Sequence, residues 1–122
     1  MAKILVVGAA GQLGIELVLG LQAQNGVGNV DVSDIRVPDD EGVMRSRFLH
    51  LDATDEGAVH KVLEEGRYHA VYHLAAMLSA TGEKKPIAAW DLNMQSLLNV
   101  LEAAKEGWVE RVFWPSSMVL HP

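Results

Sequence analysis

The fold of this chain is decided near its start, by the stretch Ile4-Leu5-Val6-Val7-Gly8-Ala9-Ala10-Gly11-Gln12-Leu13-Gly14. Its first four residues form a short apolar run typical of a buried strand, and an apolar helical pattern follows the glycines. Gly8 permits a tight turn, Gly11 lets a pyrophosphate approach the backbone, and Gly14 lets the helix pack against the sheet. Free N–H groups at the start of that helix favour phosphate. The stretch therefore predicts a dinucleotide site formed by Gly8, Gly11, Gln12, Leu13 and Gly14.

The composition indicates one acidic α/β domain spanning residues 1–122. A formal net charge of −6 argues against a nucleic-acid-binding surface, because no basic stripe exists to neutralise phosphates. The chain contains no cysteine, which excludes disulfides and thiolate chemistry. The first apolar run is too short for a signal peptide, and no segment approaches the roughly 18 apolar residues of a membrane span. We expect a soluble, cytoplasmic protein without a membrane partner.

Strand-like runs alternate with helical patterns along the chain. The predicted strands cover residues 3–7, 30–33, 47–51, 70–74 and 111–114. The predicted helices cover residues 12–24, 55–64 and 86–105, and residues 37–46 are expected to form a loop. This alternation predicts a Rossmann-type α/β fold, a doubly wound parallel sheet of about five strands in the order 3-2-1-4-5.

The predicted helix 86–105 is apolar on more than one side. One stripe contains Trp90, Met94, Leu97, Leu98 and Leu101, and another contains Ala89, Leu92, Val100 and Ala103. Such a helix is normally covered on more than one side. One face should lie on the sheet, and the other should meet a further helix or a second subunit. We expect a homo-oligomer through this helix, with deep burial inside one chain as the alternative.

Asp34 ends the predicted second strand, twenty positions after Gly14. An acidic side chain at this place binds the ribose hydroxyls of adenosine. Its charge repels a 2′-phosphate, which favours NAD over NADP, although the nearby Arg36 could accommodate that phosphate. The alternative is that Asp34 is simply a solvated strand end.

Further candidate cofactor contacts follow the third and fourth strands. Asp52 and Ala53 should lie near the adenine, although Asp52 could equally be an N-terminal helix cap. The small side chains of Leu74-Ala75-Ala76 would let the backbone pass under the cofactor at the switch point of the sheet.

Two other groups of polar residues could carry chemistry. Ser116 and Ser117 follow the fifth strand, where a hydroxyl can hydrogen-bond a reacting carbonyl, although a Ser-Ser pair also occurs in ordinary turns. His69 and His73 are four residues apart, which on a strand separates them by about 13 Å. We therefore expect no metal site.

These segments resemble the extended short-chain dehydrogenase/reductase family, which includes NAD-dependent epimerases and dehydratases, and within it the short-chain type of L-threonine 3-dehydrogenase. The resemblance covers essentially the whole chain but only the N-terminal part of such an enzyme. Its most specific parts are residues 78–84 and the string Phe113-Trp114-Pro115-Ser116-Ser117; residues 8–14, 33–36, 73–76 and 90–94 also match.

The resemblance implies an oxidoreductase that oxidises L-threonine to 2-amino-3-oxobutanoate and passes a hydride to NAD. It implies that Ser117 is the active-site serine, that Ser79 helps to hold the substrate, and that Asn93 belongs to a relay behind the nicotinamide. The family's general base is a tyrosine four residues before a lysine. Neither Tyr68 nor Tyr72 has that lysine. We therefore expect the catalytic Tyr-Lys pair and the substrate region to be absent from these residues, with NAD bound but little turnover.

Two other functions stay open at this point. One is a non-catalytic NAD-binding or assembly module, which the two-sided helix 86–105 would suit. The other is a fragment of a nucleotide-sugar epimerase or dehydratase, which the loop at residues 79–84 makes less favourable.

Overall fold

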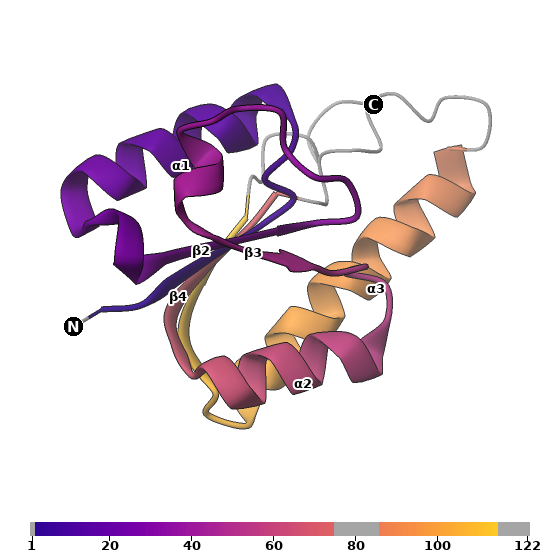
Figure 1. Ribbon diagram of the computed structural model, residues 1–122. Helices are drawn as coiled ribbons and strands as arrows, with labels where there is room; N and C mark the ends of the chain where they lie inside the picture. The colour runs from indigo at the N-terminus through magenta and orange to yellow at the C-terminus, as the bar shows by residue number, and fades with distance from the viewer. Residues whose placement is uncertain (1, 75–85, 115–122) are drawn as a thin grey trace.

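Five parallel strands form one sheet in the order β3-β2-β1-β4-β5 (Figure 1). The structure is a computed structural model that describes residues 2–74 and 86–114. Its strands are β1 (Ile4–Val7), β2 (Val30–Asp34), β3 (Arg47–His50), β4 (Tyr68–His73) and β5 (Val109–Phe113). The predicted fold class and the predicted strand order are confirmed.

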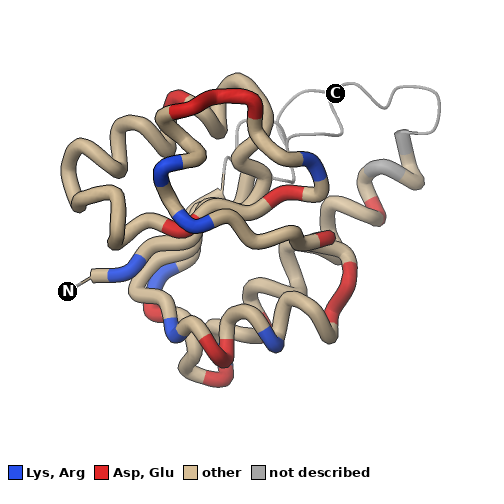
Figure 2. Tube along the Cα trace, in the orientation of Figure 1, with Lys and Arg blue, Asp and Glu red and all other residues tan. Residues whose placement is uncertain are grey.

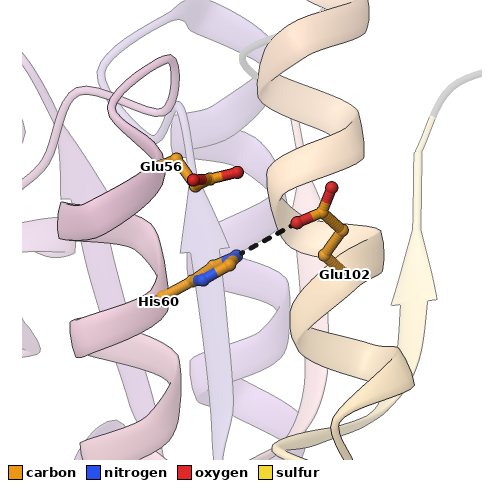
Figure 3. Close-up of side chains that lie close together, drawn as sticks. All are labelled: Glu56, His60 and Glu102. Atoms are coloured by element: carbon orange, nitrogen blue, oxygen red, sulfur yellow. Dashed lines mark ion pairs between the residues drawn. The ribbon is translucent and has the colours of Figure 1, made fainter.

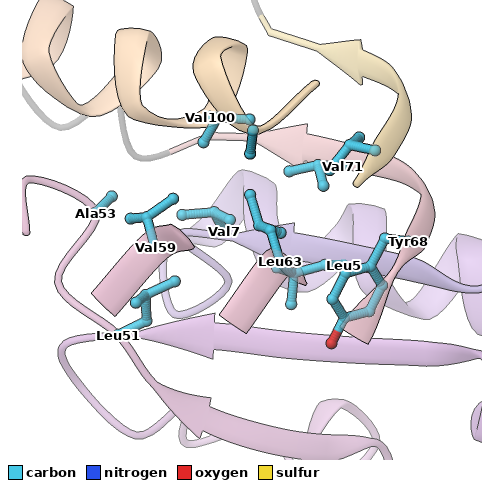
Figure 4. Packing of buried hydrophobic residues seen from close by; sticks show 11 residues of the cluster. Leu5, Val7, Leu51, Ala53, Val59, Leu63, Tyr68, Val71 and Val100 are labelled. Atoms are coloured by element: carbon cyan, nitrogen blue, oxygen red, sulfur yellow. The ribbon is translucent and has the colours of Figure 1, made fainter. Parts of the chain in front are cut away.

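The helices cover both faces of this sheet. Helix α1 (Gln12–Asn25) lies on one face, and α2 (Glu56–Gly66) and α3 (Pro86–Lys105) lie on the other (Figure 1). Side chains of β1 alternate between two buried clusters, because successive strand residues point to opposite faces. One cluster contains Ile4 and Val6 with Val18 of α1, and the other contains Leu5 and Val7 with residues of α2 and α3 (Figure 4).

Some element boundaries differ from the sequence-based prediction. Strands β4 and β5 each begin two residues earlier than expected, at Tyr68 and Val109, whose side chains are buried. The Tyr68 hydroxyl donates to the buried Asp31 carboxylate of β2 at 2.7 Å. Burial is the main cause that raises the pKa of Tyr68, and the hydrogen bond to Asp31 is the second. The expected loop at residues 37–46 contains a 3-10 turn, Val43–Arg45. Its Val43 side chain is buried in the cluster beneath α1.

The side of α3 that faces the core contains Val100 and Ala103 of the second predicted stripe, together with Leu97 of the first. Leu92 is 57% exposed, although Ser96 and Asn99, one and two turns further along the same side of the helix, are buried. Trp90 and Leu98 are both 45% exposed. The helix is apolar on two sides, and within residues 2–74 and 86–114 only one side is covered.

The surface carries mixed charge. Figure 2 shows lysines and arginines interspersed with acidic residues over the described part of the chain, and the acidic run 39–41 lies between β2 and β3. No helix among the described residues is both long enough and apolar enough to cross a membrane.

Candidate functional site

The glycine turn follows β1 at the carboxyl edge of the sheet, where β1 lies between β2 and β4. Gly8 has a φ of +90°, a conformation that side chains rarely adopt. The N–H groups of Gly8 and Ala9 both donate to the Ser33 carbonyl of β2, at 2.9 and 3.0 Å. The turn is therefore fastened to the neighbouring strand before α1 begins.

The first turn of α1 has free space beside Gly11 and packs closely on the glycine turn at Gly14. Gly11 is the N-cap and has no side chain with which to cap the helix, and a Cβ on Gly11 would meet no atom of the described residues within 4 Å. A Cβ on Gly14 would lie 2.6 Å from the Gly8 carbonyl oxygen and 2.9 Å from Ala9 backbone atoms. The first-turn N–H groups have no partner inside the helix, and Gln12 and Leu13 are exposed beside them. A diphosphate fits this arrangement because backbone N–H groups and the helix dipole both favour an anion.

Asp34 lies directly beside this turn. Its side chain is only 5% exposed, and its Oδ2 accepts from the Ala10 N–H at 2.9 Å while Oδ1 accepts from the Arg36 N–H at 3.1 Å. The alternative of a solvated strand end is therefore wrong. The Ala10 contact was missed by the sequence analysis, because it uses a backbone amide that no residue type identifies. Arg36 itself is exposed.

The loop after β3 presents the other acidic candidate. Asp52 is exposed, and its Oδ1 accepts from the hydroxyl and the N–H of Thr54, which hold the pKa of Asp52 below its usual range. Asp52 is not the cap of α2, because Asp55 holds that position and accepts from the Ala58 N–H. Ala53 is buried, and its carbonyl accepts from the Asn99 side chain of α3 at 2.9 Å.

The end of β4 brings a buried histidine close to α3. His73 Nε2 lies 3.0 Å from the Ser96 hydroxyl oxygen, and that hydroxyl donates to the Asn93 carbonyl at 2.8 Å. Because the hydroxyl has only one proton, His73 Nε2 must be the donor in the first contact. His73 Nδ1 is then a bare acceptor, buried and without a partner among the residues that the structure describes, and burial lowers the pKa of His73 to about 4. In the sequence, His73 stands out as a candidate metal ligand and as part of the matching segment 73–76, and neither signal reveals its contact with Ser96.

Of the remaining predicted site residues, Leu74 and Asn93 lie among the described residues and four others do not. Leu74 donates its N–H to the Val7 carbonyl at 2.8 Å, so it continues the sheet edge beside β1. Asn93 is half-buried on α3, and its Nδ2 has no partner among the described residues. Four predicted residues and the neighbouring Ser116 lie outside the described residues, namely Ala75, Ala76, Ser79 and Ser117.

His69 and His73 contact different elements. His69 Nδ1 lies 3.1 Å from Glu110 of β5, whereas His73 contacts α3. The two histidines are therefore not brought to one metal.

An open apolar pocket adjoins the predicted site. It has a volume of about 180 Å³ and lies between α1, β4 and β5, with a lining of Leu13, Leu17, Tyr72, Leu74, Phe113 and Trp114. Leu13 and Leu74 also belong to the predicted cofactor residues, so the pocket and the strand-end site share a border.

The chain is similar to several proteins of known sequence or structure. It is 44% identical over 97% of its length to an uncharacterized epimerase/dehydratase of Staphylococcus aureus, and it spans 37% of that relative. It is 51% identical to a GalE-like L-threonine dehydrogenase from Cupriavidus necator in its holo form, with a TM-score of 0.83 over 94% of this chain and 37% of that one. It is 41% identical to the L-threonine dehydrogenase of Clostridium difficile, with a TM-score of 0.84 over 96% of this chain and 37% of that one.

A family model covers nearly the whole chain. Residues 4–120 match the NAD dependent epimerase/dehydratase family, a span that begins with β1 and includes the glycine turn. The open helix start and the Asp34 carboxylate described above fit this cofactor. The chain therefore belongs to the NAD dependent epimerase/dehydratase family, with NAD as its cofactor.

Proposed function

We propose that this chain is the NAD-binding portion of an oxidoreductase of the L-threonine 3-dehydrogenase type. The observation that carries the cofactor part is the Asp34 carboxylate, held 2.9 Å from the Ala10 N–H beside the open start of α1. The proposed diphosphate site and the proposed acceptor for the ribose hydroxyls are therefore adjacent, as binding of the adenosine diphosphate part of NAD requires.

Each described residue has a separate role in this proposal. The first-turn N–H groups of α1 hold the diphosphate, Asp34 accepts hydrogen bonds from the ribose hydroxyls, and Asp52 and Ala53 border the adenine. The negative charge of Asp34 disfavours a 2′-phosphate, so NAD is preferred over NADP. Bound NAD supplies the hydride acceptor for oxidation of a hydroxyl-bearing carbon.

The proposed substrate is supported by the similarity of this chain to solved enzyme structures. Solved structures that are 51% and 41% identical to this chain are named L-threonine dehydrogenases. A UDP-glucose 4-epimerase is 24% identical, with a TM-score of 0.76, which supports a common fold alone. We therefore favour L-threonine over a nucleotide sugar, with Ser117 and Ser79 as the residues that would contact it.

Replacing Asp34 with alanine should weaken NAD binding by at least about 30-fold, since hydrogen bonds to a charged group contribute roughly 1.5–3 kcal/mol each. The matched control is Asp39→Ala, which removes the same charge from an exposed side chain and should keep the wild-type affinity. Calorimetric titration with NAD measures both variants. Equal affinity in Asp34→Ala and wild type would refute the proposed ribose contact. NADH formation from L-threonine, followed in the same samples, should be slight.

We further propose that the exposed side of α3 contacts a second copy of the chain. Ile87, Trp90 and Leu98 recur at helical spacing there and are 78%, 45% and 45% exposed. Leu98→Glu should therefore shift the chain to the monomer in sedimentation velocity. Leu19→Glu places the same charge on an exposed leucine of α1 and should leave the dimer intact. A wild-type chain that sediments as a monomer at every concentration would contradict the contact; one solved relative is named as monomeric.

A further inference from the structure

A cluster of potential metal ligands lies between α2 and α3, outside the dinucleotide site. Glu56 and His60 are four residues apart on α2, a spacing that puts both side chains on one face of a helix. Glu102 of α3 faces them across the helix pair, and Figure 3 shows the three side chains pointing toward one another. Contrary to the expectation from His69 and His73 that there is no metal site, we propose that Glu56, His60 and Glu102 bind one divalent transition-metal cation of the zinc type.

The spacing of the donor atoms suits such an ion. One ligand atom from each residue lies within 4.8 Å of the other two, and His60 Nε2 is 3.7 Å from a Glu102 carboxylate oxygen. Ligands at about 2.1 Å from a tetrahedral zinc ion are roughly 3.4 Å apart. The histidine and Glu102 are therefore nearly at the required separation. Glu56 is exposed, and one of its carboxylate oxygens lies within the same 4.8 Å of the other two ligand atoms.

The state of His60 is the independent observation that points to a ligand. The His60 side chain is 28% exposed, but its Nε2 atom is buried and has no hydrogen-bond partner among the described residues, because the Glu102 carboxylate lies 3.7 Å away, at ion-pair distance and too far for a hydrogen bond. The ring is held edge-on against Trp108, with centroids 5.7 Å apart. A buried nitrogen without a partner is costly. A cation between this nitrogen and the two carboxylates would satisfy all three groups.

A second histidine–glutamate pair in the same protein shows what an ordinary contact looks like. His69 Nδ1 and Glu110 Oε2 lie 3.1 Å apart on neighbouring strands, at hydrogen-bonding distance. The His60–Glu102 pair is longer although both residues lie on packed helices. At 3.7 Å the His60–Glu102 contact is an ion pair without a hydrogen bond, and this separation is close to that of two ligands of one ion.

The donor set determines the class of metal. An imidazole nitrogen favours zinc, cobalt or nickel, whereas magnesium and calcium favour sites made wholly of oxygen. Two carboxylates balance the charge of the cation, and three protein ligands leave a position for water. Because α2 and α3 each contribute ligands, the ion would join the two helices. The Asn99 hydrogen bond to the Ala53 carbonyl would connect it to the loop after β3.

Titration of tag-free protein with Zn²⁺ and, separately, Co²⁺ tests the site without NAD. We expect one equivalent to bind saturably, with a visible Co²⁺ absorption band and a rise in the thermal midpoint. His60→Gln should weaken binding at least about tenfold, because even outer contacts to metal ligands are worth 10–100-fold. His69→Gln is the matched control and should bind as wild type does.

Two results would overturn the proposal. One is the lack of a saturable site in the wild type, and the other is an equal loss of affinity in His60→Gln and His69→Gln. Far-UV circular dichroism and NAD binding verify that each variant is folded. Glu102→Gln replaces His60→Gln if that variant does not fold, and it should show the same loss.

Discussion

Replacing Gly14 with alanine is expected to abolish NAD binding and to lower the free energy of unfolding by about 3 kcal/mol. The added Cβ would lie 2.6 Å from the Gly8 carbonyl oxygen and 2.9 Å from two backbone atoms of Ala9. All three neighbours are backbone atoms, so no flexible side chain can move aside. Helix α1 must shift away from the turn, which strains the hydrogen bonds from Gly8 and Ala9 to Ser33.

Gly20 provides the control within the same helix. It is exposed, and a Cβ there would meet nothing within 4 Å. Gly20→Ala should therefore stabilise the protein by about 0.5–1 kcal/mol through helix propensity alone, with NAD affinity unchanged. Urea unfolding and calorimetric NAD titration measure both variants. A Gly14→Ala protein that matched the wild type in both measurements would show that close packing of α1 on the turn is unimportant.

Local sequence signals were sufficient to predict the sheet and the glycine turn. They were not sufficient to predict the first residues of β4 and β5. Strand β1 is wholly apolar, and the glycines follow it directly, so both could be predicted from adjacent residues. The start of β4 depends on Tyr68, whose hydroxyl partner Asp31 is 37 residues away. A polar aromatic residue at that point carries no local sign that it will be buried.

The same limit applies to α3 and to the site. Helical spacing shows which residues share a side of the helix, but not how deeply each of them is buried, so the burial of Leu97 and the exposure of Leu92 could not be predicted. The contacts of α3 with the site join residues 23 and 46 positions apart, His73 with Ser96 and Asn99 with Ala53. Such contacts exist only once the helix is packed. By contrast, Asp34 could be predicted because its distance from the glycines is set by a single strand–helix–strand unit.

The buried His73 should make the fold sensitive to mild acid. Its pKa is lowered by burial from 6.5 to about 4, so the folded state favours the neutral ring while the unfolded chain takes up a proton near pH 6.5. The unfolded state therefore binds more protons between these two pH values, and stability rises with pH across that window. The difference corresponds to about 3 kcal/mol, fully present above pH 6.5 and lost progressively as the pH falls toward 4.

His73→Gln isolates this contribution, because the glutamine Nε2 can still donate to the Ser96 hydroxyl but cannot titrate. Urea unfolding between pH 4.5 and 7.5 should show a shallower pH dependence for this variant than for wild type. Parallel curves for His73→Gln and wild type would mean that protonated His73 is tolerated inside the fold. The described part of the chain offers His73 Nδ1 no partner, which argues against that tolerance, since a proton there would bury both a charge and an unsatisfied N–H.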